Sequence, residues 1–142
     1  MVHFTQIDNF GSGSGPSVTQ GTTPWVIGEM PTASSSFAIT PESSSVIEAS
    51  HILKASAGNL YSLYVLSTVS GYLMTFNATS APSNGAVTPV ECIPVFANNF
   101  ATIDFTAGPP DYYSTGIIAV FSTTGPLTLT SSTTAWFKWR VQ

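Results

Sequence analysis

Turn-forming residues recur at short intervals from residue 46 to the C-terminus, and they leave no room for long helices. Breaks such as Ala57-Gly58-Asn59, Ser70-Gly71 and Gly108-Pro109-Pro110-Asp111 separate short runs rich in β-branched and aromatic residues. No segment keeps apolar residues at helical spacing for more than about two turns. The sequence therefore predicts an all-β protein, an antiparallel, jelly-roll-like β-sandwich of about seven or eight strands.

The expected strands lie between these breaks. They cover residues 46–54, 60–67, 72–78, 90–95, 100–105, 116–122, 127–129 and 134–141. The run from Ile117 to Phe121 is continuously apolar, which predicts burial on both faces of its strand. Because Pro94 has no N–H to donate, its strand is expected to lie at an edge of a sheet or to end there.

Residues 1–45 have a different composition from the rest of the chain. Gly11-Ser12-Gly13-Ser14-Gly15-Pro16 is typical of a flexible linker, and short apolar islands around Phe10 and Trp25 interrupt polar runs. This pattern predicts an extended N-terminal arm over residues 1–45, followed by the β-sandwich domain over residues 46–142. Phe10 and Trp25 are candidate anchors for the chain's own domain, a neighbouring subunit or a different protein.

Charged residues make up only 7% of the 142 residues, whereas typical soluble domains have roughly 25%. Like molecules with such a surface repel one another weakly, which favours a protein with permanent partners over a neutral-surfaced monomer. The net charge is −4, and the basic residues are only Lys54, Lys138 and Arg140. Nucleic-acid binding needs clusters of cations, so nucleic acid is not an expected ligand.

No uncharged apolar run approaches the ~20 residues of a membrane helix, so we expect no membrane contact. The N-terminus lacks the basic and apolar regions of a signal peptide, which predicts a protein made in a cytoplasm.

Groups that perform catalysis are scarce. The histidines are His3 and His51, no Gly-x-Ser-x-Gly elbow occurs, and neither Glu91 nor Asp104 has a visible carboxylate mate. The single cysteine, Cys92, lies in an apolar run and is interpreted as a buried structural thiol. We therefore expect a protein that is not an enzyme and has no catalytic residues, no metal and no cofactor.

Aromatic residues are the strongest candidates for recognition. Trp136 shares one face of the last expected strand with Lys138 and Arg140, and Tyr112 and Tyr113 follow two prolines in an expected loop. Exposed rings can stack on sugars, but Trp, Tyr and Arg are also enriched where subunits meet. The low surface charge favours the second interpretation, which makes these five residues candidates for an interface.

Several segments resemble a β domain of structural proteins from tailed bacteriophages. They are His51-Ile52-Leu53-Lys54-Ala55-Ser56-Ala57-Gly58-Asn59-Leu60-Tyr61-Ser62-Leu63-Tyr64-Val65, Phe76-Asn77-Ala78-Thr79-Ser80-Ala81-Pro82, Gly85-Ala86-Val87-Thr88-Pro89-Val90, Ser114-Thr115-Gly116-Ile117 and Ser122-Thr123-Thr124-Gly125-Pro126-Leu127. The likeness covers about residues 47–137, and its motifs are turns and strand starts. The ending Trp136-Phe137-Lys138-Trp139 departs from the small or polar residues expected there.

The resemblance implies a component of the virion, such as a capsid decoration (cement) protein, the base of a head fibre or a tail protein. The expected partners are copies of the chain, with a trimer favoured, and the major capsid protein or another virion protein. The arm would reach across a neighbouring subunit and stabilise the shell. A carbohydrate-binding or fibre module for host recognition remains an alternative, as does a hydrolase hidden in the sandwich.

Overall fold

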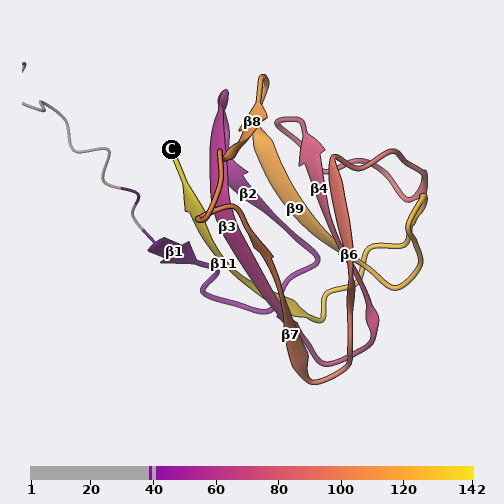
Figure 1. The fold of residues 1–142 in the computed structure, drawn as a ribbon. Coiled ribbons are helices and arrows are strands. Elements are labelled where there is room, and N and C mark those ends of the chain that lie inside the picture. Colours follow the sequence, from indigo (N-terminus) through magenta and orange to yellow (C-terminus); the bar gives the residue numbers. More distant parts are fainter. Residues whose placement is uncertain (1–38, 40) are drawn as a thin grey trace, which may run out of the picture. The chain divides into compact units, whose positions relative to one another are not determined.

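The computed structural model describes residue 39 and residues 41–142, and this part of the chain contains strands and no helix (Figure 1). The strands are β1 (Pro41–Ser43), β2 (Ser50–Lys54), β3 (Gly58–Ser67), β4 (Gly71–Asn77), β5 (Gly85–Ala86), β6 (Glu91–Val95), β7 (Asn99–Asp104), β8 (Asp111–Tyr113), β9 (Ile117–Ser122), β10 (Thr128–Leu129) and β11 (Ala135–Val141).

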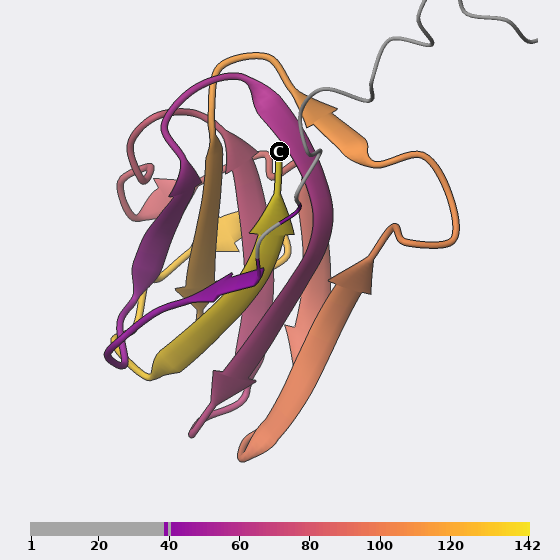
Figure 2. The same ribbon diagram turned by 90° about the vertical axis from the view of Figure 1, so that its left-hand side faces the viewer.

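Two antiparallel sheets face each other. One has the order β1-β11-β3-β7, with β8 pairing with the first residues of β3, and the other has the order β2-β9-β4-β6 (Figure 2). Because β1, β3 and β11 belong to one sheet and β2, β4 and β9 to the other, the chain crosses repeatedly between the layers. This is the strand order of a jelly roll, so the predicted all-β sandwich is confirmed.

The main core fills the space between the two sheets. A period of two is clear where Leu63 and Val65 of β3 and Phe137 of β11 point inward with no exposed surface. Other fully buried members of this core include Leu60, Leu73, Tyr113, Ile117, Ala119, Phe121 and Ala135. Burial of these side chains supplies the apolar stabilisation of the fold, at about 25 cal/mol per Å².

A second, smaller core lies on the outer face of the four-stranded sheet. There the short β5–β10 pair brings Leu129 onto Met74, Ile118 and Val120. This cover explains why every residue of β9 is buried, as the continuous apolar run from Ile117 to Phe121 predicts. The strand that contains Pro94 is β6, which lies at an edge of its sheet as expected.

Three short strands were not expected from the sequence. β1 pairs with β11 through Pro41, Glu42 and Ser43, all exposed, so no alternation of burial marks them. The segment expected to be the arm, residues 1–45, therefore contributes one strand, β1, to the five-stranded sheet. β5 has two residues and β8 has three, which is too short for a periodic pattern.

Candidate binding groove

The outer face of the five-stranded sheet carries three rungs of side chains across β11, β3 and β7. Cα pairing places Trp136 beside Leu66 and Leu66 beside Phe100, which makes an apolar rung. The next rung joins Lys138, Tyr64 and Thr102, and the third joins Arg140, Ser62 and Asp104. The face thus changes from apolar to charged along the strands.

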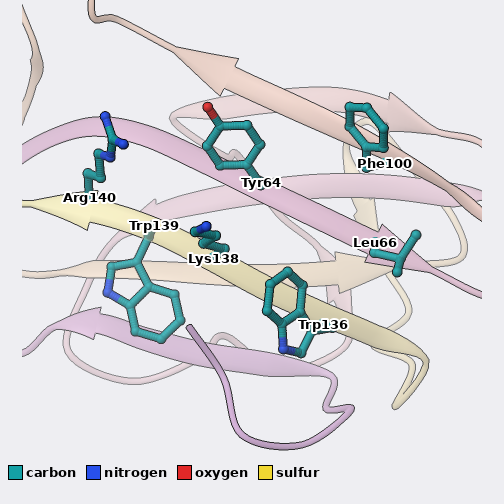
Figure 3. Close-up of a pocket in the computed structure, with 7 residues that line it drawn as sticks. All are labelled: Tyr64, Leu66, Phe100, Trp136, Lys138, Trp139 and Arg140. Atoms are coloured by element: carbon teal, nitrogen blue, oxygen red, sulfur yellow. The ribbon is translucent and has the colours of Figure 1, made fainter. Parts of the chain in front are cut away.

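These rungs border a groove of about 460 Å³. We define the outer groove by the residues that line it: Tyr64, Leu66, Phe100, Trp136, Lys138, Trp139 and Arg140 (Figure 3). Trp139 also borders the groove, but its side chain is buried in the main core, where its ring centroid lies 4.3 Å from that of His51. Phe100 is 69% exposed and Leu66 is 44% exposed, so the apolar rung presents large side chains to whatever enters.

One wall of the outer groove is fixed by a hydrogen bond. The indole Nε1 of Trp136 donates to the backbone oxygen of Ser44 at 2.7 Å, which ties the ring to the segment between β1 and β2. Ser44 is itself bonded to Phe137, whose backbone N–H donates to its Oγ at 2.9 Å. The Trp136 ring is therefore oriented before any ligand arrives.

The groove gathers most of the chain's positive charge. Lys138 and Arg140 line it. Within residues 41–142, neither of these two cations has a carboxylate within 4.0 Å, whereas His51 and Glu48 form such a contact at 2.8 Å. Asp104 belongs to the same rung as Arg140, but its Oδ1 accepts a hydrogen bond from the Thr106 N–H at 2.8 Å. This bond lowers the pKa of the Asp104 carboxyl, which keeps it ionised.

The structure brings together three of the residues singled out from the sequence. Trp136, Lys138 and Arg140 share the outward face of β11, as predicted. Phe10 and Trp25 lie outside the described residues.

The neighbouring residues Tyr112 and Tyr113 differ in exposure to solvent. Tyr112 is 64% exposed in β8, away from the groove-lining residues. Tyr113, also expected to be available to a partner, is completely buried, so that expectation is wrong. Its hydroxyl lies 2.7 Å from Thr75 Oγ1, because pairing of β8 with β3 turns the side chain toward the opposite sheet.

Tyr64, Leu66 and Phe100 were not singled out from the sequence. Each occupies the outward phase of its strand, between inward residues that are buried, such as Leu63 and Val65 of β3 and Ile103 of β7; this alternation is the signal that could have identified them. Strand order was still needed to place Phe100 of β7 beside Leu66 of β3.

Glu91 and Asp111 lie close enough for the charge of one to act on the other. Burial, and then the neighbouring Asp111, raise the pKa of Glu91. Burial, and then Glu91, also raise the pKa of the Cys92 thiol, which disfavours the reactive thiolate. Among the residues that the structure describes, His, Cys, Asp and Glu nowhere gather in a group of three or more that could hold a metal.

Comparison of the chain with models of protein families, with curated proteins and with solved structures gave no match. The described residues also include no helix that is long and apolar enough to cross a membrane.

Proposed function

We propose that this chain is a non-enzymatic structural protein of a bacteriophage particle, a capsid decoration protein that binds other protein chains through its β-sandwich. The outer groove carries this proposal, because it exposes large apolar side chains and two cations on one face of a chain with 7% charged residues. Exposed apolar surface of this kind is typical of sites where proteins meet.

The phage assignment is supported by the sequence segments that resemble the virion β domain. Their glycines occupy positions where space or backbone angle is restricted. A Cβ on Gly116 would lie 2.7 Å from the Ala78 backbone oxygen, and Gly85 has φ +131°. Jelly rolls are common in viral capsid proteins, and this analogy adds weight at the level of fold alone.

In this proposal the sandwich self-associates, with a trimer favoured, and seats on a major capsid protein or another virion protein. A stable contact of this kind would bury roughly 1,200–2,000 Å². Residues 1–45 contribute anchors such as Phe10 and Trp25 to the same attachment.

Native mass spectrometry of the full chain, combined with co-sedimentation on capsids of the phage that encodes it, tests the proposal. We expect a small closed oligomer that sediments with the capsids. The variant Phe100→Ala should weaken sedimentation, whereas Leu127→Ala, which removes an exposed apolar side chain outside the groove, should not. A monomer that ignores the capsids at every concentration would overturn the proposal.

The second candidate function is carbohydrate binding on a host-recognition fibre. The observation that favours it is the presence of the Tyr64, Phe100 and Trp136 rings around one shallow groove. Under this alternative, Trp136→Ala removes glycan binding without changing the oligomer's mass. Binding to a glycan array that survives Trp136→Ala would exclude the outer groove as the sugar site.

A further inference from the structure

The charge around the outer groove is opposite in sign to that of the rest of the described chain. Residues 41–142 carry five acidic side chains, which are Glu42, Glu48, Glu91, Asp104 and Asp111, and three basic ones. Two of those three basic side chains, Lys138 and Arg140, line the outer groove, and neither has an ion-pair partner within 4.0 Å among residues 41–142. A protein that is acidic overall has thus concentrated its cations at the place where large apolar side chains are also exposed.

The two kinds of group follow each other along β11 in a fixed order. Trp136 lies at the apolar end with Leu66 and Phe100, Lys138 comes two residues later, and Arg140 four residues later. A strand rises about 3.4 Å per residue, so the cations follow the apolar rung at about 7 and 14 Å. An extended peptide that runs along β11 presents alternate side chains with the same spacing.

We propose that the outer groove binds an extended segment of a partner protein that carries a large apolar side chain followed, two and four residues later, by carboxylates. The apolar side chain packs against Trp136, Leu66 and Phe100. The carboxylates meet Lys138 and Arg140, and the guanidinium of Arg140 is suited to paired hydrogen bonds with a carboxylate. The inference rests on the proposed function, because it names the chemistry by which a protein partner would be recognised.

Other occupants match these observations less well. A neutral sugar uses the rings but offers no negative charge to Lys138 and Arg140, of which Arg140 already interacts electrostatically with the Asp104 carboxylate. Two cations are too few for the phosphate backbone of a nucleic acid. A second copy docked by the same face around a two-fold axis would bring both pairs of cations into one interface, where they repel.

The recognition must act through side chains rather than by extension of the sheet at β11. β11 is already paired on both sides, with β1 and with β3, so its backbone groups are not available to an incoming strand. The segment therefore runs along β11 on the outer face of the sheet. Affinity depends on one anchoring side chain and on charge, and it should decrease as salt screens the exposed cations.

Fluorescence anisotropy with the full chain and labelled peptides tests the inference. The probe has the sequence SWSESES, and the controls are SWSQSQS, which lacks the carboxylates, and SASESES, which lacks the anchor. We expect the probe to bind roughly tenfold more tightly than SWSQSQS at low salt, and this ratio to shrink at high salt. SASESES should bind more weakly than the probe as well.

Protein variants then assign the preference to the groove. The double variant Lys138→Gln/Arg140→Gln should bind SWSESES and SWSQSQS equally, whereas Lys54→Gln, which removes the basic residue outside the groove, should keep the ratio. Phe100→Ala should weaken both peptides. All these side chains except Lys54 are exposed, and urea unfolding of each variant checks that it is folded.

Equal binding of the acidic and amide peptides to the unmodified protein, or binding of neither, would overturn the inference. So would a glycan that binds the groove while the peptides do not compete with it. If the double variant still sediments with capsids as the unmodified protein does and no peptide preference exists, the inference fails while the proposed function stands. If the peptide preference is found but capsids are not bound, the failure is that of the proposed function.

Discussion

The indole Nε1 of Trp136 lies 2.7 Å from the backbone oxygen of Ser44, to which it donates a hydrogen bond across 92 positions of sequence. The same serine also bonds to the backbone of β11, since its Oγ accepts from the Phe137 N–H at 2.9 Å and its own N–H donates to the Phe137 oxygen at 2.9 Å. One residue thus holds a ring of the outer groove and the backbone of a core residue. Ser44 therefore contributes both to the orientation of the Trp136 ring in the outer groove and to the stability of the sandwich.

Replacement of this serine should destabilise the protein without changing its surface. Ser44→Ala leaves the Phe137 N–H without its side-chain acceptor in a buried place, and we expect a loss of about 1–2 kcal/mol in the free energy of unfolding. The matched control is Ser43→Ala, an exposed neighbour, which should change stability by less than about 0.5 kcal/mol. Urea unfolding measures both, and equal effects would show that the Ser44 hydroxyl contributes nothing.

Gly116 and Gly108 allow a matched comparison of a crowded glycine with an uncrowded one. A Cβ on Gly116 would lie 2.7 Å from the Ala78 oxygen and 3.0 Å from the Lys54 oxygen, whereas one on Gly108 would meet nothing within 4 Å. Because backbone atoms cannot move aside easily, Gly116→Ala should cost about 1–3 kcal/mol. Gly108→Ala should stay within about 0.5 kcal/mol. Thermal or urea unfolding compares them, and a Gly116→Ala protein as stable as its control would contradict the packing described.

Tyr113 should make stability depend on alkaline pH. Burial raises the pKa of its phenol in the folded chain, while an unfolded tyrosine titrates near 10. The folded state then retains a proton that the unfolded state loses, so this contribution is complete below about pH 10 and decreases as pH rises beyond it. We expect the free energy of unfolding to fall from about pH 10 to about pH 11.

The variant Tyr113→Phe isolates this effect. It should lose about 1 kcal/mol at neutral pH, because the hydroxyl no longer bonds to Thr75 Oγ1. Its stability should decline less steeply in alkaline solution than that of the unmodified protein. Urea unfolding at stepwise pH values measures both slopes, and parallel curves would show that the phenol is not responsible.

Periodicity predicted the longer strands but could not predict how side chains from different strands combine. The alternation along β11 placed Trp136, Lys138 and Arg140 on one face, because side chains on a strand alternate by geometry alone. The position of Tyr113 depended on a strand of three residues, in which no period can be detected. The groove needed pairing of β3 with both β11 and β7, and such long-range pairing is not encoded in any local pattern.

β9 is paired with a strand on both edges and packed against a core on both faces, and this protects its amide hydrogens from exchange. Val120 pairs with Ser50 on one neighbour and with Met74 on the other, and no residue of β9 is exposed. Deuterium can reach this strand only when the sandwich as a whole opens, so its exchange rate reports the global free energy of unfolding. Any ligand that binds only the folded chain therefore slows exchange in β9, even if it sits on the far face of the other sheet.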